Sequence, residues 1–204
     1  AFHTVVFTNL TRDHLDFHRT MENYAAAKRR LFEGAGGPPP KFAVINHGDS
    51  WGRKLEKLGG FAPISYGLNG GAAVTAVKIE CDLDGTRFTA QTPRGRFPVR
   101  SPLLGKLNVL NVLAAIGVGL SYGLTDEEMA EGIAACRVVP GRFELVSQGQ
   151  PFLVAVDYAH TDDALRNLIR AARELLTARA PRGRIITLFG CGGDRLFLSG
   201  FLGP

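Results

Sequence analysis

The chain has 204 residues, 45% of them hydrophobic and 21% charged, which predicts a soluble globular protein of one domain or parts of two. Its net charge of +5 comes from scattered Lys and Arg residues. Because there is no long basic block with interleaved aromatic residues, we expect no nucleic-acid partner, whereas attraction for small anions such as nucleotides fits the charge. No apolar run reaches the roughly 18 residues of a membrane span, so no membrane partner is expected.

The three cysteines, Cys81, Cys136 and Cys191, lie far apart and form no C-x-x-C pair. A disulfide framework or a zinc site is therefore not expected, and the cysteine pattern is consistent with a reducing compartment. No signal peptide opens the chain. The first residues instead predict a buried strand, His3–Phe7, that is already under way.

A helix is predicted over Met21–Phe32, with Thr20 as a suitable N-cap and Gly34 as a residue that can end it. Two short apolar runs then predict buried strands at Phe42–Asn46 and Phe61–Tyr66.

The segment Ala73–Val99 alternates between apolar and polar residues and contains Asp84–Gly85, which predicts a hairpin with antiparallel strands on either side. An apolar helix is predicted over Leu107–Tyr122. Another is predicted over Asp126–Cys136, because a Thr-x-x-Glu capping box opens it.

The pattern breaks near Pro140, where we place a domain boundary. A strand at Phe152–Val156, a helix at Asp162–Ala178 and a strand at Arg184–Phe189 follow, and this βαβ order implies parallel pairing. The predicted fold class is α/β. It combines a mostly parallel sheet with helices, a small antiparallel hairpin region and an incomplete βαβ domain at the C-terminus.

Lys28 lies on the apolar stripe of the first predicted helix. The stripe comprises Met21, Tyr24, Ala25, Leu31 and Phe32. A lysine among apolar residues is a local inconsistency, and such inconsistencies concentrate at functional sites. The alternative, which spacing alone favours, is a lysine whose stem lies along the apolar surface while its ammonium group reaches solvent.

Four residues with metal-binding side chains precede this helix. They are Asp13, His14, Asp16 and His18. Their spacing matches no standard zinc pattern. The alternative is a set of polar side chains in a loop that leads to the helix.

Five stretches, in the same order, resemble the Mur ligases, the ATP-dependent amino-acid ligases of peptidoglycan synthesis. They are FTNLTRDHLDFHRTMENYAAAKRRLF (7–32), GKLNVLNVLAAI (105–116), PGRFELV (140–146), VDYAHTDDAL (156–165) and FGCGGDR (189–195). The last stretch is distinctive of the tripeptide-forming type. The resemblance implies that residues 1–140 are the C-terminal portion of the central ATP-binding domain. It also implies that residues 141–204 begin a truncated, Rossmann-like C-terminal domain.

The resemblance implies that Lys28 is carbamylated by carbon dioxide and that the carbamate helps to position Mg²⁺ beside the phosphates of ATP. It implies that His14 belongs to the same metal site, so both residues are candidate catalytic and metal-binding residues. Carbamylation requires a neutral amine, which burial favours, and it creates the anionic oxygen that Mg²⁺ prefers. Histidine is a less typical ligand for Mg²⁺.

The resemblance also implies four cofactor-binding residues. Asn111 is expected to contact the base of ATP, and Arg142, Asp157 and His160 are expected around ATP at the cleft between the domains. Asp157 ends a predicted parallel strand, and ligands gather at the carboxyl ends of such strands. The alternative for Asp157 and His160 is a plain helix cap. Asp162 departs from the family, which usually has proline there.

The implied reaction is peptide-bond formation, in which a substrate carboxylate attacks the γ-phosphate of ATP and an amine then attacks the acyl phosphate. For the tripeptide-forming type, the substrates are UDP-N-acetylmuramoyl-L-alanyl-D-glutamate and either diaminopimelate or L-lysine. The implied location is the bacterial cytoplasm, and a monomer is expected. Two alternatives stay open. One is a related ligase of folate polyglutamylation or cyanophycin synthesis, and the other is a non-catalytic nucleotide-binding remnant.

The sequence contains no G-x-x-x-x-G-K-[ST] phosphate-binding motif. The resemblance places that motif, and a UDP-sugar domain, before residue 1, so the isolated chain is expected not to ligate. In residues 141–204, two strands cannot bury both faces of a parallel sheet. An exposed sheet edge and an exposed apolar tail are therefore expected there.

Overall fold

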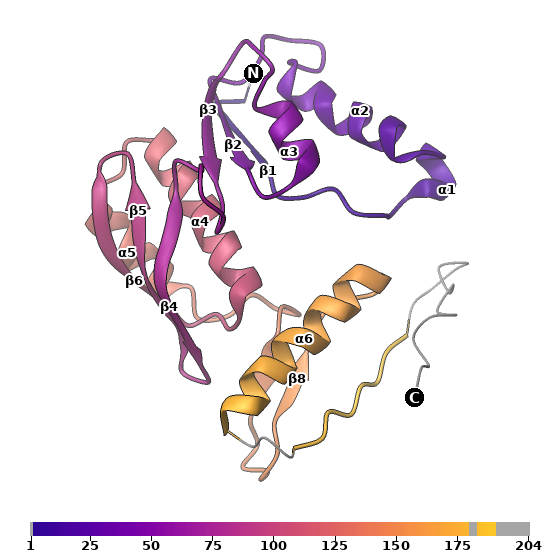
Figure 1. The fold of residues 1–204 in the computed structure, drawn as a ribbon, viewed down its shortest axis with the longest axis vertical. Coiled ribbons are helices and arrows are strands. Elements are labelled where there is room, and N and C mark those ends of the chain that lie inside the picture. The colour runs from indigo at the N-terminus through magenta and orange to yellow at the C-terminus, as the bar shows by residue number, and fades with distance from the viewer. Residues whose placement is uncertain (1, 180–182, 191–204) are drawn as a thin grey trace. The chain divides into compact units, whose positions relative to one another are not determined.

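Figure 1 shows the computed structural model, in which residues 2–179 and 183–190 are described. The chain divides into two compact units, Ala1–Arg137 and Val138–Pro204. Within the described ranges, no helix combines the length and the apolar character needed to cross a membrane.

The first unit begins with a three-stranded parallel sheet in the order β1-β2-β3. Its strands are β1 (Thr4–Phe7), β2 (Phe42–Asn46) and β3 (Ala62–Tyr66). The connections contain the helices α1 (Leu15–His18), α2 (Met21–Phe32) and α3 (Ser50–Leu55). Since the strands run in the same direction, the segments that follow β1 and β2 start at the same edge of the sheet.

An antiparallel sheet follows in the order β4-β5-β6. Its strands are β4 (Thr75–Asp82), β5 (Gly85–Thr92) and β6 (Gly95–Ser101). The predicted hairpin is confirmed, because Asp82 pairs with Gly85. The third strand was not predicted, although the Pro-Arg-Gly turn before it is a recognisable hairpin signal.

Two helices complete the first unit: α4 (Lys106–Ser121) and α5 (Asp126–Ala135). The capping box that predicts α5 is confirmed, with the Thr125 hydroxyl accepting from the backbone of Glu128 and the Glu128 carboxylate accepting from the backbone of Thr125. The N-cap predicted for α2 is also confirmed, since the Thr20 hydroxyl accepts from the backbone N–H of Asn23 at 3.1 Å. The short helices α1 and α3 were not predicted.

Strand β2 separates two hydrophobic clusters because successive side chains of a strand point to opposite faces. Ala43 and Ile45 pack in one cluster with Phe32 of α2 and Leu55 of α3. Val44 packs in the other cluster with apolar residues of α4 and of the antiparallel sheet. The parallel sheet is therefore covered on both faces, as parallel sheets require.

The packing of α4 on the sheet leaves no room at Gly117, where an added Cβ would lie 2.7 Å from a methyl carbon of Val44. We expect Gly117→Ala to lower the free energy of unfolding by about 1–3 kcal/mol through overpacking. Gly132→Ala in α5 is the matched control, because nothing lies within 4 Å of its added methyl group. The control should gain up to about 1 kcal/mol from helix propensity. Urea unfolding of both variants measures the difference, and equal stabilities would contradict the packing account.

The second unit contains β7 (Glu144–Val146), β8 (Val154–Val156) and α6 (Asp162–Arg179). The two strands pair antiparallel. The predicted βαβ unit is therefore wrong within the described residues, because β8 pairs with the unpredicted β7 and residues 184–189 form no strand. A strand requires a neighbour, and no partner pairs with this segment in the described part of the chain.

The predicted exposed edge of the second unit is confirmed for its described residues. Phe152 is 65% exposed next to β8, and Val156 within it is 47% exposed. Leu188 is 99% exposed. Most of the predicted apolar tail lies outside the described residues.

Candidate functional site

The segment that follows β1 carries His14 into a short helical turn. His14 precedes α1 with a φ of 53°, in the left-handed region that non-glycine residues seldom adopt. Its Nε2 lies 3.4 Å from the Oδ2 of Asp13, and its backbone N–H donates to the Oδ1 of the same carboxylate at 2.8 Å. The Asp13 carboxylate therefore holds both the backbone and the ring of His14.

Lys28 lies on α2, and the residue is exposed although it falls on the apolar stripe. Helical spacing defined the direction of the apolar stripe but not its width. The stripe is buried at Phe32 and half-buried at Tyr24, whereas Leu31 is 36% exposed. The exposure of Lys28 agrees with the alternative, in which the end of the side chain reaches solvent.

The ring of Tyr24 is the common neighbour of the predicted site residues. The Nζ of Lys28 lies 5.0 Å from the centroid of this ring, within the range of a cation–π contact. The ring of His14 meets it edge-on with the centroids 5.9 Å apart, and the ring of His18 stacks on it at 4.7 Å. The structure therefore brings His14 and Lys28 together through a residue that the sequence presented only as part of the apolar stripe. The four-residue spacing from Tyr24 to Lys28 is the signal that could have revealed it.

Among residues 2–179 and 183–190, no group of three His, Cys, Asp or Glu side chains could hold a metal ion. Mg²⁺ does not require such a group, because it usually keeps several waters and binds to one or two protein oxygens and to substrate phosphates. A carbamate on Lys28 with the imidazole of His14 would be a donor set of this limited kind. A magnesium ion held by these two residues would take most of its ligands from nucleotide and water.

Asn111 is exposed on α4, where its Nδ2 donates to the Oδ1 of Asn108 at 3.1 Å. Asn108 is buried and donates in turn to the carbonyl oxygen of Leu104 at 2.8 Å, which fixes the pair on the helix. Asn111 also lines a cavity of about 490 Å³ between α4, α5 and the end of β6. The other lining residues are mostly apolar and include Val112, Met129 and Ile133. An amide at the wall of an apolar cavity is suited to a flat ring with polar edges.

In the second unit, two of the three predicted nucleotide residues, Arg142 and His160, contact the ring of Tyr158. The guanidinium carbon of Arg142 is 5.7 Å from the centroid of its ring, and the ring of His160 meets it edge-on at 5.0 Å. The Asp157 carboxylate accepts from the backbone of Phe143 and of Ala159, both at 2.8 Å. Asp157 thus ties β8 to the segment that carries Arg142.

The alternative of a plain helix cap does not fit Asp157 and His160. The residue in the capping position of α6 is Thr161, whose hydroxyl accepts from the backbone of Ala164 at 3.3 Å. Asp162, at the family's proline position, begins α6 and pairs with Arg166 one turn later.

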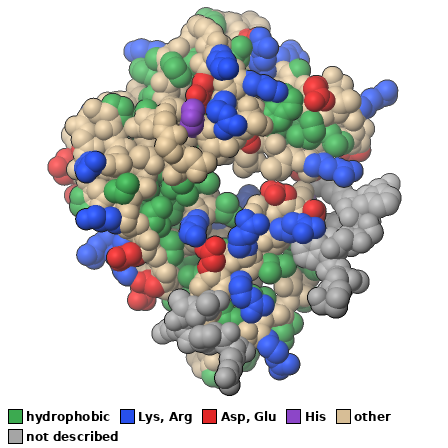
Figure 2. All heavy atoms as spheres, viewed as in Figure 1, with side chains coloured by type: hydrophobic (Ala, Val, Ile, Leu, Met, Phe, Trp, Pro, Cys, Tyr) green, Lys and Arg blue, Asp and Glu red, His purple; other side chains and the backbone are tan. Residues whose placement is uncertain are grey.

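On the face shown in Figure 2, acidic side chains lie among the Lys and Arg side chains.

This fold and these clusters have a match among known families. The model of the Mur ligase middle domain matches residues 1–119, and that of the Mur ligase glutamate ligase domain matches residues 141–199. The chain belongs to the Mur ligase family.

Its relatives include ligases that add diaminopimelate. The chain is 57% identical over 95% of its length to the UDP-N-acetylmuramoyl-L-alanyl-D-glutamate--2,6-diaminopimelate ligase of Solibacter usitatus, and 46% identical to that of Geobacter sulfurreducens. It spans 38% of the length of each. A solved structure of a ligase with the same name is 32% identical, with a TM-score of 0.68 over 94% of this chain and 39% of that one.

Proposed function

We propose that a full-length ligase carrying this chain is the ATP-dependent enzyme that adds diaminopimelate to UDP-N-acetylmuramoyl-L-alanyl-D-glutamate. The observation that carries the proposal is the 57% identity to a ligase of that name over 95% of this chain. The chain spans 38% of the length of that relative, so the proposal concerns the activity of the full-length enzyme and not of this chain alone. A UDP-linked precursor and ATP are cytoplasmic compounds, so the proposed location is the bacterial cytoplasm.

Each unit has a proposed role in this enzyme. We assign residues 1–140 to the central ATP-binding domain and residues 141–204 to the start of the C-terminal domain, in agreement with the ranges of the two family matches. The proposed enzyme acts as a monomer, and nucleic acid and membrane are not proposed as partners.

The metal site that we propose uses Lys28, as a carbamate, and His14. Mg²⁺, when bound, would neutralise charge on the phosphates during phosphoryl transfer. Support comes from family membership and from the shared contact of both side chains with Tyr24. Carbamylation of an amine requires its neutral form and adds a carboxylate, which supplies the oxygen ligand.

The residues proposed to bind ATP are Asn111 in the first unit and Arg142, Asp157 and His160 in the second. The guanidinium group of Arg142 suits a phosphate, because it can donate two parallel hydrogen bonds. The amide of Asn111 beside an apolar cavity suits the adenine ring.

The role of Asn111 leads to a prediction about affinity. We expect Asn111→Ala to raise KM for ATP by about tenfold, the loss of one well-placed hydrogen bond, with little change in kcat. Gln replaces the amide in the control variant Asn111→Gln, which should recover part of the affinity. Steady-state kinetics give the KM of both variants for ATP and, as a test of base recognition, for GTP. An unchanged KM for ATP in the alanine variant would show that Asn111 does not bind ATP.

A ligation assay tests the proposed function. The full-length ligase is incubated with ATP, Mg²⁺, UDP-N-acetylmuramoyl-L-alanyl-D-glutamate and either diaminopimelate or L-lysine, and the products are identified by mass. The proposal expects the diaminopimelate tripeptide together with ADP and phosphate. A product from L-lysine alone would correct the substrate, and glutamate addition to a folate instead would refute the proposal.

A further inference from the structure

The segment between β1 and His14 is held by side chains that reach it from the next strand and helix. The Nδ2 of Asn46 donates to the carbonyl oxygen of Thr8 at 2.7 Å. The backbone N–H of Leu10 donates to the Oδ2 of Asp49 at 3.1 Å. Backbone groups that leave a sheet need new partners, and here two side chains supply them.

The same two side chains also hold their own turn, between β2 and α3. The Oδ1 of Asn46 accepts from the backbone of Gly48 at 2.9 Å, and the Oδ1 of Asp49 accepts from the backbone of Trp51 at 2.7 Å and of Gly52 at 3.1 Å. Each side chain therefore uses one end for its turn and the other for the segment after β1. An N-cap requires only the first of these bonds.

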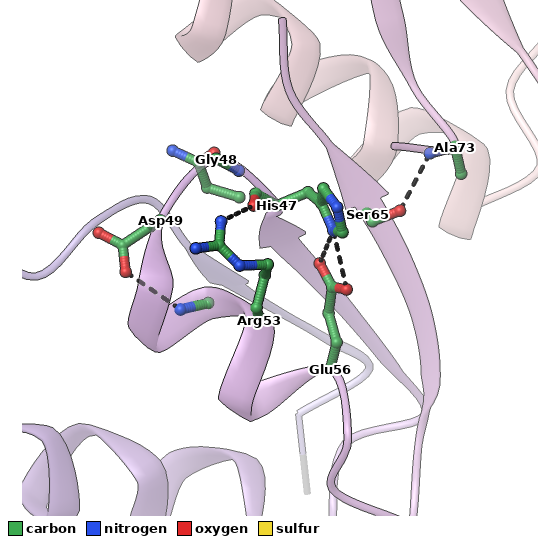
Figure 3. Close-up of polar contacts among 9 residues, drawn as sticks. His47, Gly48, Asp49, Arg53, Glu56, Ser65 and Ala73 are labelled. Carbon is green, nitrogen blue, oxygen red and sulfur yellow. Dashed lines mark hydrogen bonds and ion pairs between the residues drawn. The ribbon is translucent and has the colours of Figure 1, made fainter. Parts of the chain in front are cut away.

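The turn is braced from its other side as well. Figure 3 shows the guanidinium of Arg53 on the carbonyl oxygen of His47, at 2.8 Å, and the carboxylate of Glu56 facing the His47 ring. The Nδ1 of His47 lies 3.1 and 3.0 Å from the two oxygens of Glu56. Asp49 thus projects from a turn that is held at two further points, by Arg53 of α3 and by Glu56 directly after it.

A third side chain holds the end of β1. The hydroxyl of Tyr66 donates to the carbonyl oxygen of Phe7 at 3.3 Å. Burial, and secondarily the negative charge of Asp49, raise the pKa of Tyr66 above its usual value, so the hydroxyl keeps the proton that it donates. The side chain of Leu10 is 5% exposed, which anchors the segment in the core below these bonds.

We propose that Asn46 and Asp49 are positioning residues of the ligase reaction, which hold Thr8–Leu10 and so set the place of His14 relative to Lys28. The inference rests on the proposed function. A displacement of about 1 Å in a reacting arrangement is enough to cost as much as 10²-fold in rate. Only three residues lie between Leu10 and His14, so a loose segment would move the imidazole directly.

Asp49→Ser in the full-length ligase separates the two tasks of the side chain. Serine caps helices about as well as aspartate, but its single oxygen lies too close to its own backbone to serve Leu10 as well. We expect kcat to fall by about tenfold and the Mg²⁺ concentration for half-maximal rate to rise several-fold, with the melting temperature nearly unchanged. Asn46→Asp removes the donor to Thr8 and keeps the acceptor for Gly48, and it should show the same combination.

Thr125→Ala is the matched control, because it removes the cap of α5, in the same unit, and touches none of these bonds. It should lower the melting temperature without changing the Mg²⁺ dependence. Hydrogen exchange of the Leu10 amide gives a readout that does not depend on activity, and it should accelerate at least about tenfold in Asp49→Ser alone.

Wild-type kcat and Mg²⁺ dependence in Asp49→Ser would overturn the positioning role, and so would unchanged exchange of the Leu10 amide. Absence of ligation by the wild-type enzyme would instead refute the proposed function. In that case amide exchange alone decides whether Asp49 holds the segment.

Discussion

We expect Lys28→Ala to lower the kcat of the full-length ligase by at least about 10²-fold, the usual cost of removing a group that stabilises developing charge. The variant loses the amine that would become the carbamate, and with it an oxygen ligand for Mg²⁺. The effect is measured as ADP release at saturating substrates, with and without added bicarbonate. The wild-type rate should depend on bicarbonate, whereas the residual rate of the variant should not.

Two further variants separate the carbamate from the charge of Lys28. Lys28→Arg keeps a cation beside Tyr24 but cannot be carbamylated in this way, so it should be as inactive as the alanine variant. Arg30→Ala removes an exposed cation from the same helix and should keep the wild-type rate. Activity in Lys28→Arg close to that of the wild type would show that charge alone is needed and would remove the carbamate from the account.

Asp157→Ala is the second change with a large expected effect. The Asp157 carboxylate accepts from the backbone of Phe143, whose φ of 48° lies in the left-handed region, and this bond helps to hold the segment that carries Arg142. We expect KM for ATP to rise by at least about tenfold and the second unit to lose about 1–3 kcal/mol, because two backbone donors lose their acceptor. ATP titrations and unfolding curves of the full-length ligase measure the two effects.

Asp163→Ala is the control for this change. Asp163 lies at the start of α6, and its carboxylate accepts from the side chain of Asn167, one turn later on an exposed face. Its loss should change stability by less than about 0.5 kcal/mol and leave KM for ATP unchanged. If Asp157→Ala binds ATP as tightly as this control, the role of Asp157 is confined to the fold.

Local signals in the sequence were enough to predict several elements. Helix α2 follows from its N-cap Thr20 and its apolar stripe, and α5 follows from its capping box, because these bonds join residues that are neighbours in the chain. The predicted strand at 42–46 also agrees with β2, although its hydrogen bonds run to strands that are distant in the sequence. A short apolar run between turns is buried wherever the sheet forms.

The incorrect predictions concern contacts with distant residues. Helix α3 depends on its N-cap Asp49, whose carboxylate also accepts from Leu10 in the segment after β1. It also depends on Gly52, which lies so close to the backbone of Asn46 that no side chain fits there. The strand predicted at 184–189 lacks a neighbouring strand among the described residues. Periodicity placed Lys28 on the apolar stripe of α2, but the extent of burial depends on what packs against the helix.

The same distinction applies to the candidate site. Residue types and order, compared with a known family, led to His14, Lys28 and Arg142. Their arrangement around the rings of Tyr24 and Tyr158 became visible only in the structure, because those contacts depend on the direction in which each side chain leaves the backbone.

Isotope transfer tests the central claim, ATP-driven amide-bond formation, most directly. The full-length ligase is given UDP-N-acetylmuramoyl-L-alanyl-D-glutamate with ¹⁸O at both oxygens of its reacting carboxylate, together with diaminopimelate, ATP and Mg²⁺. Mass spectrometry of the phosphate then follows the label. The account predicts one ¹⁸O atom in each phosphate released with the tripeptide, because the carboxylate oxygen leaves as part of the acyl phosphate. Unlabelled phosphate, or hydrolysis of ATP without tripeptide, would contradict it.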